Sequence, residues 1–226
     1  MNRRRRRTSG GADHPSELAL HLAEGFPGGV TTRQAVAEEA ARLLCDGEEL
    51  EFAAAKRRAG QHLGARRGEQ PSNLEVHEAL KRYLELFEAE ALAERLHHLR
   101  TEALHAMRFF AAFRPHLVGP VLYGTACVNT PVTLHLFADE PEAVFRRVLE
   151  LKVFVDTDER DFRYPDGRTQ SRVVYTFERG ETLFDIVTLP ESEVGHPPIS
   201  GVDGRPMRRV RAEEVESLLA TSPAPV

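Results

Sequence analysis

The chain has 226 residues, of which 41% are hydrophobic and 29% charged, a composition typical of a soluble globular protein with one large domain or two small ones. No apolar run reaches the roughly 18–20 residues that a membrane helix needs. The two cysteines, Cys45 and Cys127, are far apart and in no metal-binding spacing. We therefore expect no membrane partner, no disulfide framework and no zinc knuckle, and a reducing cytoplasm as the setting.

The N-terminal 30 residues are rich in Arg, Gly, Ser and Pro, which predicts disorder apart from a short helical piece near 16–24. The basic run in this tail consists of Arg3, Arg4, Arg5, Arg6 and Arg7. These five arginines contribute +5 to a formal net charge of −5, so the rest of the chain carries −10. An acidic body argues against nucleic-acid binding by the body itself. Two interpretations of the arginines stay open, a solubilising tail or a contact with phosphate backbones.

Apolar residues recur with a helical period throughout residues 31–113. The four predicted helices begin near Thr31 or Thr32, Glu48, Ser72 and Ala89. Gly47 is expected to end the first helix and Pro115 the fourth. Ser72 and Glu75 have the spacing of a capping box, in which the two side chains satisfy free backbone N–H groups. The sequence therefore predicts an all-helical first half.

From residue 117 the apolar period changes from 3.6 to 2, which is typical of strands. The predicted strands span 117–123, 132–137, 153–155, 172–177 and 182–189. Helices are expected over about 139–151 and 212–220, and 156–167 is predicted to be a polar turn region. The fold class is therefore α+β, with a tail (1–30), a helical region (31–113) and a small mixed-sheet domain (114–222).

The segment 121–139 predicts a strand, a tight turn at Gly124-Thr125 and a second strand. This arrangement resembles the opening of nucleotidyltransferase-like domains, and the resemblance covers roughly 117–190. It implies that a Gly-Ser pair approaches a nucleotide triphosphate and that two carboxylates on the next strand hold Mg²⁺ ions. Here Gly124-Thr125 occupies the Gly-Ser position, while Pro131 and Thr133 occupy the two carboxylate positions. Only five residues separate Thr125 from Pro131, about half the usual number, so the resemblance implies a degenerate active site.

Asp185 takes the position of the third carboxylate, within the apolar run 183–187. An ionised aspartate is rarely buried unless it is paired or metal-bound. Arg172 on the neighbouring strand is one expected partner, and a role in a site is the other interpretation. His135 shares a strand face with Thr133 and is a further candidate ligand. The candidate catalytic residues are therefore Asp185 and His135, the candidate metal ligand is Asp185, and the candidate binding residues are Gly124, Thr125, Thr133 and Arg172.

Three functions follow from these features. The first is a non-catalytic nucleotidyltransferase-like protein that binds a nucleotide, a nucleic acid or another protein. The second is an active nucleotidyltransferase with Mg²⁺ and nucleotide as cofactors, whose ion ligands have moved to Asp139, Glu140, Asp185 and His135. The third is a helical protein-interaction module over residues 31–113. The loss of two carboxylates favours the first, since it removes several kcal/mol of transition-state stabilisation.

The full layout, with Lys56-Arg57-Arg58, the run 107–110 and the run 119–122, is similar to an uncharacterised proteobacterial family over about residues 30–220. Some members of that family carry the name UDP-N-acetylmuramate–alanine ligase. Such ligases have a Gly-Lys-[Ser/Thr] phosphate loop, and this sequence contains none. The resemblance therefore implies a layout and a bacterial, cytoplasmic setting, but not that reaction.

Overall fold

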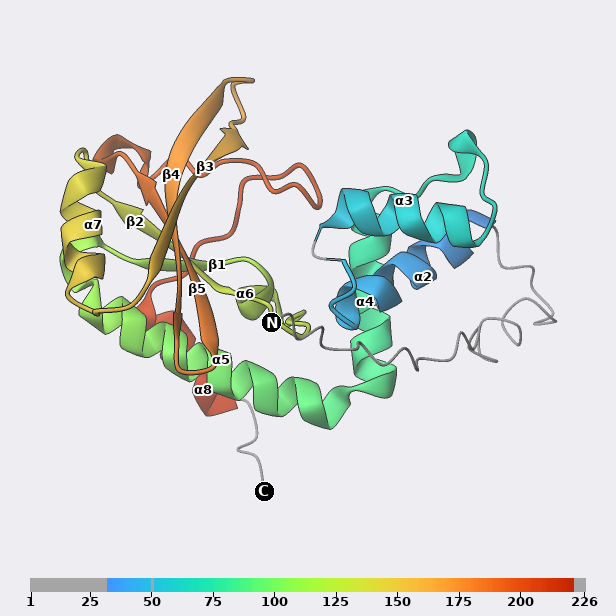
Figure 1. Cartoon of the computed structure of the whole chain (residues 1–226), viewed down its shortest axis with the longest axis horizontal. Coiled ribbons are helices and arrows are strands. Elements are labelled where there is room, and N and C mark those ends of the chain that lie inside the picture. Colours follow the sequence, from blue (N-terminus) through green and yellow to red (C-terminus); the bar gives the residue numbers. More distant parts are fainter. Residues whose placement is uncertain (1–31, 50, 222–226) are drawn as a thin grey trace, which may run out of the picture.

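The computed structural model describes residues 32–49 and 51–221, in which helices come first and a five-stranded mixed sheet with interspersed helices follows (Figure 1). The α+β prediction is confirmed. The predictions for the tail 1–30, with its arginine run 3–7 and helical piece 16–24, lie outside the described residues. Among the helices that are described, none is long and apolar enough to cross a membrane.

Three helices form a separate helical lobe, which we define as α2 (Thr32–Cys45), α3 (Phe52–His62) and α4 (Asn73–Phe87). Their apolar faces share one buried cluster, which includes Val36, Ala40, Leu43, Ala55, Ala59, Val76, Leu80 and Leu84. The predicted capping box is present at the start of α4. The Glu75 amide donates to Ser72 Oγ at 3.2 Å, and the Ser72 amide donates to Glu75 Oε2 at 2.7 Å.

Helix α5 (Ala89–Phe109) runs along both halves of the molecule (Figure 1). Leu92, near its start, packs against the core of the helical lobe and also against the core of the sheet. The stretch from Leu96 to Phe110 contributes only to the sheet core. The helix was predicted to end at 113 but ends at Phe109. A 3₁₀ turn, η2 (Ala111–Phe113), follows it and leads to Arg114, which has a left-handed backbone conformation.

The strands are β1 (His116–Val118), β2 (Val132–Phe137), β3 (Val155–Arg163), β4 (Thr169–Arg179) and β5 (Thr182–Leu189), in the order β1-β2-β5-β4-β3. The central pair β2–β5 is parallel, and the other pairs are antiparallel. The remaining helices are α6 (Pro120–Tyr123), α7 (Pro141–Leu149) and α8 (Ala212–Thr221), and η3 (Glu191–Glu193) is a 3₁₀ turn.

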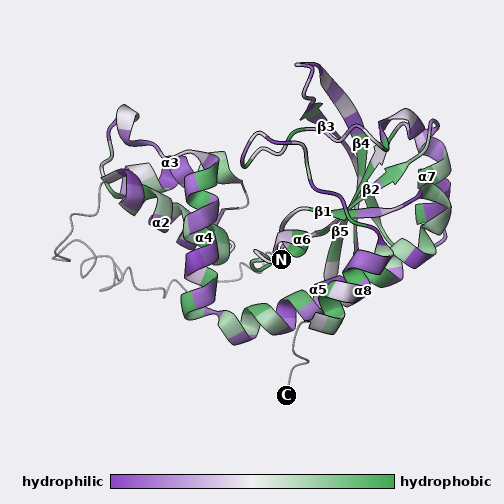
Figure 2. Ribbon diagram, turned by 180° about the vertical axis from the view of Figure 1, so that it is seen from behind, coloured by the Kyte–Doolittle hydropathy of each residue, from purple (hydrophilic) through white to green (hydrophobic). Residues whose placement is uncertain are grey.

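The two faces of the sheet have different neighbours. The helix-packed face buries Leu117, Leu134, Tyr175 and Ile186 in one cluster with residues of α5, α7 and α8. The opposite face, which we call the open face, carries Thr133, Asp185 and Thr176 side by side in neighbouring strands. Part of the open face is apolar, with Phe137, Val174, Val187 and Leu189 in a smaller cluster. Hydrophobic residues dominate β2 and β5, while β3 is mostly hydrophilic (Figure 2).

Two predicted elements are wrong in detail. The strand predicted over 117–123 stops at Val118, because Gly119 has φ +76° and the chain then forms the single turn α6. Most of the turn region predicted over 156–167 is instead the edge strand β3, and only 164–167 belongs to the turn between β3 and β4. Strand β3 pairs with β4 along its whole length. Its many charged side chains suggested a turn, but charged residues are common on exposed edge strands, where they discourage pairing with other molecules.

Candidate functional site

A cavity of about 700 Å³ lies between the helical lobe and the open face of the sheet. The sheet contributes Asp158, Arg160, Thr176, Leu183 and Asp185 to its walls, the segment 119–131 contributes Gly119, Tyr123, Thr125 and Cys127, and the helical lobe contributes Leu44, Phe52, His77 and Leu80. Two contacts join the lobes at its border. The Asn73 side-chain amide donates to the Gly201 carbonyl at 2.7 Å, and the rings of His77 and Tyr123 meet edge to face.

Asp185 lies in the cavity wall with both carboxylate oxygens engaged. Its Oδ2 accepts from Arg160 Nη1 at 2.6 Å, and its Oδ1 accepts from Thr176 Oγ1 at 2.8 Å. The Asp185 side chain is 8% exposed, whereas that of Arg160 is 43% exposed. The negative charge of the aspartate is therefore balanced by an arginine that itself reaches solvent.

Asp185 lies between two threonines in the sheet. Thr133 is its neighbour in the parallel β2–β5 register, and Thr176 is its neighbour in the antiparallel β4–β5 register. Gly119, at the end of β1, faces Thr133, since a Cβ atom at Gly119 would lie 3.8 Å from Thr133 Oγ1. The row of Thr133, Asp185 and Thr176 therefore presents two hydroxyl groups and one compensated carboxylate to the same side of the sheet.

Of the Gly-Thr pair predicted from the sequence, only Thr125 lines the cavity. Gly124 is the C-terminal cap of α6 with φ +78°, and a Cβ atom there would meet Arg100 and Leu96 of α5. The left-handed backbone conformation therefore explains the glycine at this position. Gly119 lines the cavity instead, in a conformation (φ +76°, ψ −160°) that is essentially restricted to glycine.

His135 lies on the open face but outside the cavity lining, and its side chain is almost fully buried. Its Nδ1 accepts a hydrogen bond from Arg209 Nε at 3.1 Å, which places the proton of the neutral ring on Nε2. Burial, then the charge of Arg209 and then His116 hold the pKa of the His135 imidazole well below its usual value. The structure therefore places His135 in a neutral, buried network rather than beside Asp185.

The expected pairing of Asp185 with Arg172 is not found. Arg172 instead forms an ion pair with Glu193 and stacks over the ring of Tyr164, and it does not line the cavity. The arginine that reaches Asp185 is Arg160, the residue opposite Arg172 in the β3–β4 register. Sequence reasoning missed this partner because it treated the strand that carries Arg160 as a turn.

The relocated ion ligands do not gather in one place. Asp139 lies six residues beyond Thr133, roughly 20 Å further along the strand direction. It accepts a hydrogen bond from the Glu191 amide, and Glu140 precedes helix α7. Within residues 32–49 and 51–221, no three His, Cys, Asp or Glu side chains are grouped so as to hold a metal ion. With Pro131 and Thr133 in the carboxylate positions and Asp185 paired with an arginine, these residues do not fit a two-ion Mg²⁺ site.

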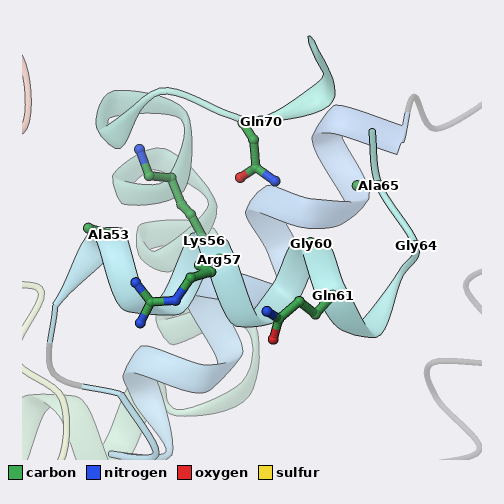
Figure 3. A pocket seen from close by; sticks show the side chains of 8 residues that line it. All are labelled: Ala53, Lys56, Arg57, Gly60, Gln61, Gly64, Ala65 and Gln70. Atoms are coloured by element: carbon green, nitrogen blue, oxygen red, sulfur yellow. The ribbon is translucent and has the colours of Figure 1, made fainter. Parts of the chain in front are cut away.

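A second, shallower cavity of about 630 Å³ lies along α3 (Figure 3). Lys56, Arg57, Gln61 and Gln70 surround a floor of glycine and alanine, and the Gln70 side chain reaches toward Gly60 (Figure 3). Arg58, which follows Lys56 and Arg57 in the chain, forms ion pairs with Glu48 and Glu49. This depression carries two cations and no carboxylate in its lining, but the sheet does not take part in it.

Comparison of the chain with protein-family models, with curated proteins and with solved structures finds no match. The family resemblances stated above therefore stay predictions that rest on the residues alone. The residues that the sequence did not single out are Gly119, Asp158, Arg160 and Thr176, all in the wall of the larger cavity. The sequence contains one signal that could have identified Gly119, namely its position directly before Pro120, a residue that is common in the first turn of a helix.

Proposed function

We propose that the chain is a non-catalytic, nucleotidyltransferase-like protein that binds a nucleotide in the cavity between its lobes without the help of divalent ions. One observation carries this proposal. Asp185 stands directly beside Thr133 in neighbouring parallel strands, as the third and second carboxylates of such a domain would, and its charge is balanced by Arg160.

The spacing problem noted in the sequence is reduced if Gly119-Pro120, rather than Gly124-Thr125, takes the Gly-Ser position. Gly119 ends β1, lines the cavity and faces Thr133. Ten residues then separate Pro120 from Pro131, which is the longer spacing that the resemblance implies. This assignment supports a nucleotidyltransferase-like layout whose two strand carboxylates have been replaced.

The cavity has properties that suit a nucleotide. Its volume falls within the ~300–1,000 Å³ of small-molecule sites. Phe52, His77 and Tyr123 offer aromatic surface to a base. The arginines in the lining are Arg160, which is paired with Asp185, and Arg208, which is paired with Glu214, and the lining also carries Glu49, Glu51 and Asp158. The hydroxyl groups of Thr125 and Thr176 in the cavity walls can donate or accept hydrogen bonds. Because catalysis of phosphoryl transfer depends on metal-held charge, replacement of two ion ligands would leave binding but lower the rate by several powers of ten.

The test is calorimetric titration of the full-length protein with each of the four ribonucleoside triphosphates, in EDTA and in MgCl₂. We expect saturable binding of at least one nucleotide in EDTA, no gain in affinity with Mg²⁺ and no release of pyrophosphate or phosphate. Arg160→Gln should weaken binding about tenfold or more, as expected for a lost charge-assisted contact. The matched control is Arg168→Gln, in the β3–β4 turn, whose side chain pairs with Asp166 away from the cavity.

Two results would overturn the proposal. The first is the absence of binding in both buffers. The second is binding that requires Mg²⁺ and is accompanied by product formation, which would instead support the active enzyme with relocated ligands.

A further inference from the structure

Two free cysteines meet at the boundary between the lobes. Cys45 is the last residue of α2, and Cys127 lies in the segment between α6 and β2, 82 positions later in the chain (45 to 127). Both are buried and belong to the same apolar cluster, where each thiol is close enough to shift the pKa of the other. No local pattern in the sequence indicates this pairing, since the separation of the two cysteines matches no disulfide or metal-site pattern.

The neighbours of the two thiols make them chemically unequal. Cys45 Sγ lies 3.3 Å from Glu88 Oε1, a suitable acceptor for its proton. Arg95 Nη2 donates to Glu88 Oε2 at 3.2 Å, and Arg95 Nη1 donates to the Ala126 carbonyl at 2.9 Å. The arginine therefore holds the carboxylate beside Cys45 and brings a positive charge next to Cys127.

These neighbours shift the pKa values of the two thiols in opposite directions. The nearby Cys45 thiol, followed by the charge of Arg95, lowers the pKa of Cys127 despite its burial. The nearby Cys127 thiol, burial and Glu88 raise the pKa of Cys45. Cys127 is thus the better nucleophile of the pair, because the thiolate is the reactive form.

Access to the two thiols also differs. Cys127 is 7% exposed and lines the cavity of about 700 Å³, whereas Cys45 is fully buried and does not line it. A small reagent in the cavity therefore reaches Cys127 before Cys45.

We propose that Cys45 and Cys127 form a redox-modification site, in which a low-molecular-mass disulfide such as oxidised glutathione converts the pair to an intramolecular disulfide. The Cys127 thiolate attacks one sulfur of the reagent, which forms a mixed disulfide and releases one thiolate of the reagent. Glu88 takes the proton of Cys45, and the Cys45 sulfur then attacks the Cys127 sulfur and displaces the second thiolate. Two protein thiols are oxidised, and one disulfide is reduced to two thiols.

The consequence of this bond is a covalent link between the lobes at the wall of the cavity. It would fix the segment that carries Thr125, Cys127 and Thr130 to the end of α2. Within this segment the Thr130 hydroxyl accepts a hydrogen bond from the Cys127 amide at 2.8 Å.

The experiment treats the reduced, full-length protein with oxidised glutathione under native conditions, followed by alkylation with iodoacetamide in denaturant and intact-mass measurement. We expect the wild-type protein to lose two hydrogens and to take up no alkyl group, with a Cys45–Cys127 cross-linked peptide in a non-reducing digest. Two alkyl groups on the treated wild-type protein, or a disulfide between two molecules, would overturn the proposal.

Two matched variants test the order of the steps, with circular dichroism as the check that each is folded. Cys45→Ser should stop at the mixed disulfide and gain one glutathionyl group on Cys127. Cys127→Ser should gain none, because Cys45 is shielded. Equal adduct formation by the two variants would contradict the assignment of Cys127 as the attacking thiol. Since the wild-type result needs no variant, it decides the proposal even if a serine substitution prevents folding.

Discussion

The two faces of the sheet are made by the same five strands, yet they have different tasks. The helix-packed face is continuous and apolar and forms one core with α5, α7 and α8. The open face combines a small apolar cluster with the row Thr133, Asp185 and Thr176, of which Asp185 and Thr176 line the cavity. Because successive side chains in a strand point to opposite faces, one sequence of alternating residues builds a core and a site at once.

Because the two faces differ in this way, we expect substitutions at neighbouring positions of β2 to differ greatly in their effect on the free energy of unfolding. Leu134→Ala on the helix-packed face should lower the free energy of unfolding by about 2–5 kcal/mol, because it leaves a cavity in a fully buried core. Thr133→Ala on the open face is the matched control and should cost far less. Urea unfolding followed by circular dichroism measures both. Similar losses for the two variants would show that the open face is also a packed core.

A second prediction concerns the buried carboxylate of the open face. Asp185→Ala should destabilise the protein by about 1–3 kcal/mol, since it removes the acceptor of two hydrogen bonds and leaves Thr176 and Arg160 without their partner. The control is Asp166→Ala, whose ion pair with Arg168 is exposed and should contribute little. A double-mutant cycle with Arg160→Ala measures the coupling directly. Independent, additive effects of the two substitutions would argue against the pairing.

The smallest expected effect is a pH dependence that comes from the buried end of the open face. The pKa of His135 is depressed in the folded state, so the unfolded state binds a proton more readily below about pH 6.5. The contribution of neutral His135 to the free energy of unfolding should therefore be complete above about that pH. It should decrease as the pH falls, by up to ~1.4 kcal/mol per pH unit for one histidine.

The slope of stability between pH 7 and 5, from urea unfolding, checks this prediction. His135→Gln should reduce the slope, although not to zero, because the pKa of His116 is also lowered by burial. His105→Gln, at an exposed position outside the sheet, is the matched control for the substitution itself. An unchanged slope in His135→Gln would mean that this imidazole is protonated in the folded protein.

Local signals predicted the helices and the central strands well. The capping box at Ser72 and Glu75 and the alternation in β2 each depend on neighbouring residues, and both are present as predicted. The edge strand β3 was not predicted, because its charged residues have weak strand propensity and it is held by pairing with β4. The same error hid Arg160, the actual partner of Asp185.

The sequence by itself determined the helical first half, the α+β class and the burial of an aspartate at position 185, since periodicity and capping act over a few residues. Only the tertiary structure decided which arginine balances that aspartate, which glycine lines the cavity and that Cys45 meets Cys127. These contacts join residues from 25 to 82 positions apart (160 to 185, 45 to 127). The order of the strands in the sheet and the docking of the two lobes set them, and both depend on residues that are far apart in the chain.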